Sequence, residues 1–371
     1  MDKFISFLKS SKNSLDRSDL KSRRVRLVLG NESCDLDSTV SALLYGYFLF
    51  ETRSAEGTLV LPILNVSRQK FSLRNENCLV LKEAGIDLSI LLFRDNIDLE
   101  KLLTLPKDCD VTLVDHHILS KQDQTLFKHV KRIVDHRPID TTNKWDPMKV
   151  QLRIEQVGSC CTLVADEILK KDRSILTKPL AYMLYQTIVF DTIALLPENG
   201  KAKDLDLQVC NILEKQFEFT EGRKNLFDRL WRVHNDVSHL SPKQLLYKDL
   251  KVVEGVLVPG LPMLVENFLK LVDSYGAVAE FCREHDLFFA VLVGLEANDV
   301  VKRDVAIFSE DTEDPMRIRL LKEFERDTTY NFQFEEIPTG FDNICLLRVH
   351  NTKLSRKQLV PLIKLAVHDS N

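Results

Sequence analysis

The stretch RVRLVLGNESCDLDSTVSALLYGYFLFET, residues 24–52, decides the fold class of this chain. Its apolar beginning, RVRLVLG, is typical of a buried strand, and its end, DSTVSALLYGYFLFET, spaces apolar residues as a helix does. Asp35 lies between the two, and Asp37 begins the helix-like part. Either acid alone is more often a helix cap or a first-turn acid than a metal ligand. The stretch therefore predicts strand, loop and helix, and it leaves the role of the two acids open.

The alternation of strand and helix continues along the chain. Short apolar or β-branched runs, each closed by polar residues, recur in GTLVLPILNV, LSILLFRD, DVTLVDHH and RIVDHRP. The helix-like TKPLAYMLYQTIVFDTIALL, residues 177–196, follows them. Such strands alternating with helices are typical of a parallel sheet covered on both faces. After an N-terminal segment, residues 1–23, we therefore predict an α/β domain over residues 24–215.

A smaller α/β domain is predicted over residues 236–371. Residues 216–235 are charged and helix-like, and we interpret them as a linker. Beyond them lie the strand-like FFAVLVGLE, VAIFSE and ICLLRVH, followed by the helix-like SRKQLVPLIKLAV. The sequence thus predicts two α/β domains.

The composition argues against several classes of function. With Lys+Arg 51 against Asp+Glu 55, the 371 residues carry a net charge of −4, which argues against general nucleic-acid or membrane-surface binding. None of the eight cysteines forms C-x-x-C, so we expect reduced thiols. No apolar run approaches the ~18 residues of a membrane span. We expect a cytoplasmic protein, and the basic, serine-rich N-terminus leaves a mitochondrial location as the alternative.

Acids and a histidine fall at the ends of the predicted strands and in the long helix. Because the carboxyl ends of parallel strands lie along one edge of a sheet, these side chains would gather there, and carboxylates so gathered repel one another unless cations lie between them. Oxygen ligands with an occasional imidazole suit Mg²⁺ or Mn²⁺, and a pair of such ions can bridge phosphate oxygens and generate a hydroxide nucleophile. The chemistry alone predicts a phosphoester or phosphoanhydride hydrolase. The residues are Asp35, Asp37, Asp115, Asp135, His136 and Asp191.

Each of these residues also has an ordinary structural explanation. An acid such as Asp191 inside an apolar helix is costly to bury, but a buried arginine could satisfy it without a metal. His116, His117 and His136 could each be an ordinary hydrogen-bonded histidine. Only the joint pattern favours a metal site.

An ordered series of motifs runs through the chain. It comprises GNESCDLDSTVSALLYGYFL, FRDNIDL, VDHHILSKQD, VDHRPI and VGSCCTLVADEIL, followed by DVSHLSPKQLLYKDLK and SRKQLVPL. Together these motifs, spread over residues 24–365, resemble the DHH phosphoesterase superfamily and, within it, the prune-type exopolyphosphatases. The resemblance implies a parallel-sheet DHH catalytic domain, a smaller α/β DHH-associated C-terminal domain, and an active site in the cleft between them.

The resemblance also implies a site for two divalent cations, Mg²⁺ or Mn²⁺. In the related family II pyrophosphatases a bridging aspartate is followed by a histidine ligand, and the 21 positions from Asp115 to His136 fit that spacing. Asn31 stands where the pyrophosphatases have a histidine, and its uncharged amide would be a weak ligand that favours Mg²⁺. One ion would be held by Asp37, Asp115, His136 and Asp191, and the other by Asp35, Asp115 and Asn31.

Catalytic and substrate-binding roles follow from the same resemblance. Arg137 replaces a histidine of the pyrophosphatases, and its guanidinium could clamp a phosphate. The cations of SRKQ lie in a first helical turn, where the macrodipole disfavours them unless an anion binds, although two solvated surface cations explain them equally well. The implied catalytic residues are Asp115, His116 and Arg137. The implied substrate-binding residues are Arg137, His117, Lys251, Arg356 and Lys357.

The resulting hypothesis is metal-dependent hydrolysis of phosphoanhydride bonds in short-chain inorganic polyphosphate, with release of orthophosphate. The first alternative is a cyclic-nucleotide phosphodiesterase, which would need a base-binding surface, and no aromatic stacking pair stands beside the motifs. The second is a signalling scaffold with weak residual phosphatase activity. The resemblance names nucleoside diphosphate kinase as a partner, an association that in longer relatives involves a C-terminal extension. We expect neither nucleic acid nor membrane as a partner.

Overall fold

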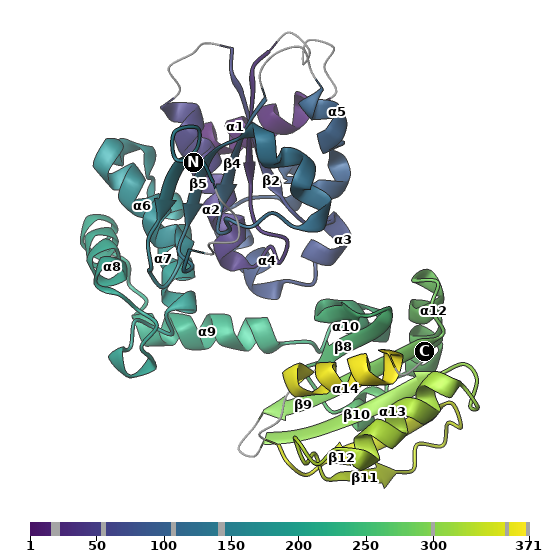
Figure 1. Ribbon diagram of the computed structural model, residues 1–371. Coiled ribbons are helices and arrows are strands. Elements are labelled where there is room, and N and C mark those ends of the chain that lie inside the picture. The colour runs from purple at the N-terminus through teal and green to yellow at the C-terminus, as the bar shows by residue number, and fades with distance from the viewer. Residues whose placement is uncertain are drawn as a thin grey trace. The chain divides into compact units, whose positions relative to one another are not determined.

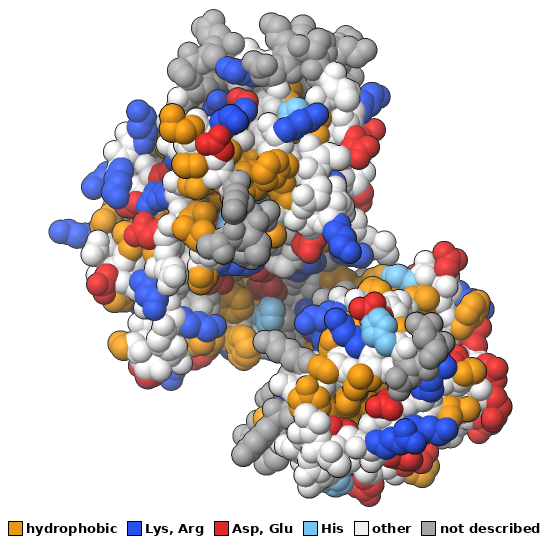
Figure 2. Space-filling view, in the orientation of Figure 1, with side chains coloured by type: hydrophobic (Ala, Val, Ile, Leu, Met, Phe, Trp, Pro, Cys, Tyr) orange, Lys and Arg blue, Asp and Glu red, His pale blue; other side chains and the backbone are white. Residues whose placement is uncertain are grey.

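The computed structural model describes residues 1–15, 23–52, 57–104, 109–139, 145–297, 301–352 and 356–368. The chain divides into two compact units, Met1–His234 and Asn235–Asn371, each with its own sheet (Figure 1). No described helix combines the length and the apolar character needed to cross a membrane. Basic and acidic side chains are mixed on the visible face of both units (Figure 2).

The first unit contains a six-stranded, fully parallel sheet, which confirms the predicted fold class. The strand order is β3-β2-β1-β4-β5-β6, so the chain reverses direction across the sheet between β1 and β4. In open α/β sheets, ligands bind at the carboxyl ends of the strands beside such a reversal. The loops after β1 and β4 emerge at that place. The strands are β1 (Val25–Leu29), β2 (Leu59–Leu64), β3 (Leu92–Phe93), β4 (Cys109–Val114), β5 (Val130–Asp135) and β6 (Gln151–Ile154).

Alternate residues of these strands supply two hydrophobic cores, one on each face of the sheet. Val28 belongs to the larger core, whereas its neighbours Leu27 and Leu29 belong to the smaller one. Helices pack on the larger core, including α1, whose Phe4 and Phe7 are fully or almost fully buried in it. The helices are α1 (Asp2–Asn13), α2 (Leu36–Glu51), α3 (Arg68–Phe71), α4 (Asn75–Glu83), α5 (Leu99–Leu103), α6 (Cys160–Lys171), α7 (Lys178–Asp191), α8 (Asp204–Phe217) and α9 (Arg223–Asn235), with 3₁₀ turns η2 (Leu88–Ile90), η3 (Arg94–Asn96), η4 (Lys121–His129), η5 (Arg173–Ile175) and η6 (Pro197–Asn199).

Three local features differ from the sequence predictions. The long helix predicted to residue 196 ends at Asp191, because residues 193–195 adopt left-handed φ angles of 53°, 59° and 59° that no right-handed helix contains. Strand β6 was not predicted, since it is half exposed and lacks an apolar run. The segment interpreted as a linker contains α9, whose Leu226 and Leu230 are buried in the core of the first unit.

The second unit contains a mixed six-stranded sheet in the order β11-β12-β10-β9-β8-β7. Only the pair β8–β9 is parallel among its described pairs. Helices α13 and α14 pack on one face, where Phe324 and Ile363 join the strand residues Val305 and Ile307 in a single core. The strands are β7 (Leu250–Val253), β8 (Val256–Leu261), β9 (Phe289–Ala297), β10 (Val301–Ser309), β11 (Phe334–Ile337) and β12 (Ile344–Val349), and the helices are α10 (Pro242–Lys248), α11 (Val265–Phe268), α12 (Ser274–Glu284), α13 (Pro315–Arg326) and α14 (Arg356–His368).

Candidate metal centre

Three of the predicted ligands meet at the carboxyl edge of the parallel sheet. Asp37 comes from the first turn of α2, Asp115 directly follows β4, and His136 directly follows β5. One ligand atom of each lies within 4.8 Å of one ligand atom of the other two. His136 Nε2 is 3.3 Å from Asp115 Oδ1 and 3.6 Å from Asp37 Oδ2. The topology therefore gathers two carboxylates and an imidazole from distant parts of the chain.

Asp37 is fixed by the N-terminus of α6. Its Oδ2 accepts the backbone N–H of Cys160 at 2.6 Å, and its Oδ1 accepts that of Cys161 at 2.8 Å. The first N–H groups of a helix have no partner within the helix, and the helix dipole favours a negative charge there. The carboxylate is thus held in one orientation while it still faces His136.

Asp115 is buried and strained. It is only 1% exposed, and its φ of 60° lies in the left-handed region, which costs free energy for a residue other than glycine. Its Oδ1 is buried without a hydrogen-bond partner of good geometry. Burial, and then the charge of Asp37, raise the pKa of Asp115 well above its ordinary value. The ionised form of Asp115 is therefore costly at this site, although His136 and Arg137 both lie near its Oδ1.

His136 presents Nε2 to these carboxylates because its other ring nitrogen is occupied. Nδ1 lies 3.0 Å from the carbonyl of Val157, and a carbonyl only accepts, so Nδ1 carries the proton. Burial disfavours the imidazolium, but the hydrogen bond to Asp115 and the charge of Asp37 outweigh it and raise the pKa of His136 to about 10. A histidine oriented in this way is ready to bind a cation through Nε2 once that nitrogen is unprotonated.

Asp191 contributes a further uncompensated charge from the last residue of α7. Its Oδ2 is buried without a hydrogen-bond partner. Burial and the charges of Asp37 and Asp35 raise its pKa well above the ordinary value. It therefore belongs to the same electrostatic cluster, although the group of atoms within 4.8 Å comprises Asp37, Asp115 and His136.

Asp35 and Asn31 have local partners that the sequence left open. Asp35 is the N-cap of α2, where Oδ1 accepts from Ser38 N at 3.0 Å. Asn31 turns its side-chain nitrogen toward the carboxylate of Asp115, and its amide oxygen accepts from Ser33 Oγ at 2.5 Å and Cys34 N at 3.0 Å. Ligation by either residue stays a prediction, and in this geometry Asn31 acts as a hydrogen-bond donor that orients Asp115.

The buried pair of His117 and Asp135 joins the loops that follow β4 and β5. His117, which the resemblance assigns to substrate, is 4% exposed, and its Nδ1 pairs with the carboxylate of fully buried Asp135. The other oxygen of Asp135 accepts the backbone N–H of His136 at 2.7 Å and of Arg137 at 3.3 Å. Substrate binding by His117 stays a prediction. The sequence marked Asp135 as a strand-end acid but did not indicate that it ties the two loops together.

His116 and Arg137 lie beside Asp115. Burial lowers the pKa of His116, and its Nδ1 lies 2.9 Å from the carbonyl of Val114, so the neutral ring keeps its proton on Nδ1. The guanidinium of Arg137 is half exposed and lies 3.8 Å from Asp115 Oδ1. The structure thus brings the guanidinium of Arg137 close to Asp115, and a catalytic role for His116 and Arg137 stays a prediction.

The predicted residues of the second unit have only partly described surroundings. Lys251 is exposed on β7. Arg356, at the start of α14, pairs with the carboxylate of Asp249 at 2.6 Å and donates to the backbone carbonyls of Asp249 and Val258 at 2.6 and 3.0 Å. Ser355 and the side chain of Lys357 lie outside the described residues. Phosphate binding by Lys251, Arg356 and Lys357 stays a prediction.

The residues of the first unit fit a divalent cation. Asp191 Oδ2 is a buried carboxylate oxygen without a hydrogen-bond partner, Asp115 Oδ1 has no hydrogen bond of good geometry, and both carboxyl groups have raised pKa values. A cation would satisfy both features at once. Because the donors are carboxylate oxygens and one imidazole nitrogen, with no thiolate, they suit a hard ion such as Mg²⁺ or Mn²⁺.

Comparison with known proteins supports this description. The profile of the DHH family, N-terminal domain, matches residues 26–188, and that of the DHHA2 domain matches residues 228–366. The mouse protein exopolyphosphatase PRUNE1 is 36% identical over 354 residues, which cover 93% of this chain and 76% of that protein. A fission yeast protein, described as a putative exopolyphosphatase, is 28% identical over 360 residues, which cover 91% of this chain and 89% of that one.

A solved structure has the same fold. It is a putative family II inorganic pyrophosphatase of Methanococcus jannaschii, similar with a TM-score of 0.52 over 92% of this chain and 99% of that one. The sequence identity is 19%, so the similarity concerns the fold alone. Both comparisons agree with a catalytic α/β unit followed by an associated second unit.

Proposed function

Since this chain belongs to the prune-type exopolyphosphatases of the DHH family and is a phosphoanhydride hydrolase, we propose that it releases orthophosphate from the end of short-chain inorganic polyphosphate. The observation that carries the proposal is the group formed by Asp37, Asp115 and His136, in which two carboxylates and one imidazole face one another. A polyphosphate end is rich in anionic oxygens, which divalent cations bridge well.

The proposed ligands divide between two cation positions that share Asp115. Divalent cations bound there supply Lewis-acid stabilisation of the charge that develops on the phosphoryl oxygens. The first cation would be held by Asp37, Asp115, His136 and Asp191. The second would be held by Asp35 and Asp115, with Asn31 holding the shared carboxylate through its amide nitrogen.

The remaining residues of the site bind and orient the substrate. Arg137 has a half-exposed guanidinium beside Asp115, and two of its N–H groups can grip a terminal phosphate. His116 has its proton on Nδ1, so Nε2 is the nitrogen that can take a proton from an attacking water. The pair of His117 and Asp135 holds both loops in register while the phosphate is bound.

One observation favours a cyclic nucleotide as a second candidate substrate. Phe190, which directly precedes Asp191, packs near Phe227 and Trp231 of α9 with ring centroids 6.0 and 6.5 Å away. Trp231 is 51% exposed. The sequence showed no aromatic pair beside the motifs, whereas the fold packs the exposed Trp231 near the residue that precedes Asp191, and a base can stack on an exposed ring.

A substrate panel tests the proposal. The purified chain is assayed with Mg²⁺ or Mn²⁺ on pyrophosphate, tripolyphosphate, long polyphosphate and cyclic AMP, with a chelator as the matched control. We expect the highest kcat/KM on tripolyphosphate and no turnover after chelation. A preference for cyclic AMP that Trp231→Ala abolishes would replace the proposal with the second candidate, and turnover of tripolyphosphate in the presence of the chelator would contradict the metal centre.

A further inference from the structure

Asp206, in the first turn of α8, lies behind the metal centre and is fully buried. Its Oδ2 accepts the backbone N–H of Gly158 at 2.8 Å and of Lys203 at 2.7 Å, and its Oδ1 accepts the hydroxyl of Thr162 at 2.5 Å. Three donors from two separate segments thus converge on one carboxylate. No motif that the sequence analysis used includes this residue.

The segment held by Asp206 touches two of the proposed ligands on its other side. The carbonyl of Val157 accepts from His136 Nδ1, and the N–H groups of Cys160 and Cys161 hold the carboxylate of Asp37. We infer that Asp206 is a positioning residue for cation binding, because it fixes the segment 157–161 that orients both His136 and Asp37. This inference rests on the metal centre proposed above.

Asp206 acts on His136 through one rigid group, the peptide unit between Val157 and Gly158. The carbonyl of Val157 and the N–H of Gly158 belong to the same planar peptide unit and, in a trans peptide, point in opposite directions. The structure contains no cis peptide bond among the described residues. When Asp206 binds the N–H, it sets the plane of the unit and therefore the direction of the carbonyl that receives His136 Nδ1. A rotation of this peptide would turn Nε2 away from Asp115.

The packing around Gly158 leaves this peptide little freedom to rotate. A Cβ atom at Gly158 would lie 2.3 Å from the methyl group of Thr192 and 3.1 Å from Asp206 Oδ2. Thr192 directly follows Asp191, so the end of α7 presses on the same unit. Close approach of this kind requires glycine. The peptide 157–158 thus has Asp206 and α7 on one side and His136 on the other.

Binding of Mn²⁺ alone tests the inference on the full chain by isothermal titration calorimetry. Asp206→Asn keeps the shape but removes the negative charge that strengthens the hydrogen bonds from the N–H groups of Gly158 and Lys203. We expect its Mn²⁺ affinity to fall by about 10–100-fold, as is common when a partner that orients a metal ligand is removed. Asp204→Asn, an exposed acid in the same helical turn, is the matched control and should bind as the wild type does.

A milder variant keeps the test decisive if Asp206→Asn does not fold. Thr162→Val removes one donor to Oδ1 and leaves both backbone N–H groups on Oδ2, and we expect a several-fold weaker Mn²⁺ affinity. If the wild type binds Mn²⁺ and the folded variants bind it equally tightly, Asp206 is only structural, even if the Tm falls, and the inference is overturned. If the wild type itself fails to bind Mn²⁺, the metal centre is overturned instead.

Discussion

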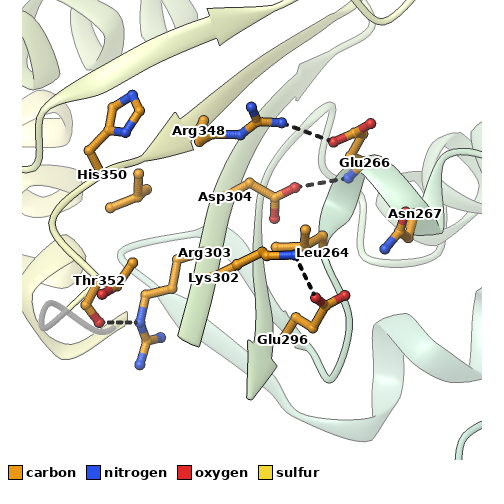
Figure 3. A pocket seen from close by; sticks show the side chains of 11 residues that line it. Leu264, Glu266, Asn267, Glu296, Lys302, Arg303, Asp304, Arg348, His350 and Thr352 are labelled. Atoms are coloured by element: carbon orange, nitrogen blue, oxygen red, sulfur yellow. Dashed lines mark hydrogen bonds and ion pairs between the residues drawn. The ribbon is translucent and has the colours of Figure 1, made fainter. Parts of the chain in front are cut away.

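At the carboxyl edge of the first sheet, Asp37, Asp115 and His136 face one another, whereas a pocket of about 500 Å³ in the second unit holds charges that are already matched (Figure 3). In that pocket Lys302 pairs with Glu296 at 3.3 Å and Arg348 with Glu266 at 3.2 Å. Both units therefore gather ionisable side chains on a sheet, but only the pocket of the second unit balances them within itself.

The buried acids of the two regions show the same contrast. In the pocket of the second unit, Asp304 is 2% exposed, and its two oxygens accept the backbone N–H groups of Val265 and Glu266 at 2.7 and 2.9 Å. In the first unit Asp191 keeps a buried oxygen without a hydrogen-bond partner, and Asp115 Oδ1 has no hydrogen bond of good geometry. Burial also raises the pKa of Asp304, but its two hydrogen bonds offset part of that cost, whereas a buried acid without such bonds favours a ligand of opposite charge.

The largest difference between the two regions is expected when one carboxylate of each region is neutralised in a separate variant. Asp115→Asn should lower kcat/KM on tripolyphosphate by about 10²–10³-fold, because the shared carboxylate no longer holds the cations that stabilise the developing charge. Glu296→Gln, the matched change in the second pocket, should leave kcat/KM within about twofold, since it breaks only an exposed ion pair. Equal losses in both variants would contradict the comparison.

The alternation of apolar runs and helices predicted the parallel sheet, and the acids at the strand ends indicated the edge at which Asp37, Asp115 and His136 gather. That part was accessible because a run of apolar residues fixes a strand, and a parallel sheet fixes where its carboxyl end lies. The gathering of Asp37, Asp115 and His136 follows from topology alone.

The sequence could not give the features that depend on hydrogen-bond direction. The amino-acid sequence does not show that Asn31 turns its side-chain nitrogen toward Asp115, or that Asp206 holds the peptide unit before Gly158. The end of α7 was missed for a related reason: Ile193 and Leu195 are ordinary helix-compatible residues, and tertiary packing imposes their left-handed conformation. Such features can be identified only from the three-dimensional positions of the residues that contact them.

The second largest expected effect is a dependence of the Mn²⁺ affinity on pH. In the metal-free protein the pKa of His136 is raised to about 10, so Nε2 is protonated at neutral pH and must lose that proton to bind a cation. Affinity should therefore rise with pH, by about tenfold per unit for each proton released, between roughly pH 7 and pH 9. Titrations in two buffers of different ionisation enthalpy count the protons. An affinity independent of pH in this range would mean that His136 is not a ligand.

A smaller effect should appear in the stability of the metal-free protein. Because burial and neighbouring charges raise the pKa of Asp191, its ionised form opposes folding above its unfolded-state pKa. Asp191→Asn should therefore raise the Tm of the metal-free first unit at pH 8, by about 2–4 °C for each kcal/mol removed. With saturating Mn²⁺ the order should reverse, since the wild type binds the ion more tightly. Scanning calorimetry with and without Mn²⁺ measures both, and a variant less stable in both conditions would contradict the uncompensated charge.

The smallest effect is expected where the charges are already balanced. Lys302→Met removes one partner of an exposed pair and leaves Glu296 in contact with solvent, so the unfolding free energy of the second unit should change by at most ~1 kcal/mol. Neither the Mn²⁺ affinity nor its pH dependence should change, because no unpaired charge is created near the metal centre. Asp304→Asn in the same pocket should cost more than Lys302→Met, since it disturbs a buried acid bound by two backbone N–H groups. Denaturant unfolding of both variants measures the difference, and if the exposed pair proved the more costly to break, burial would not be what separates the two regions.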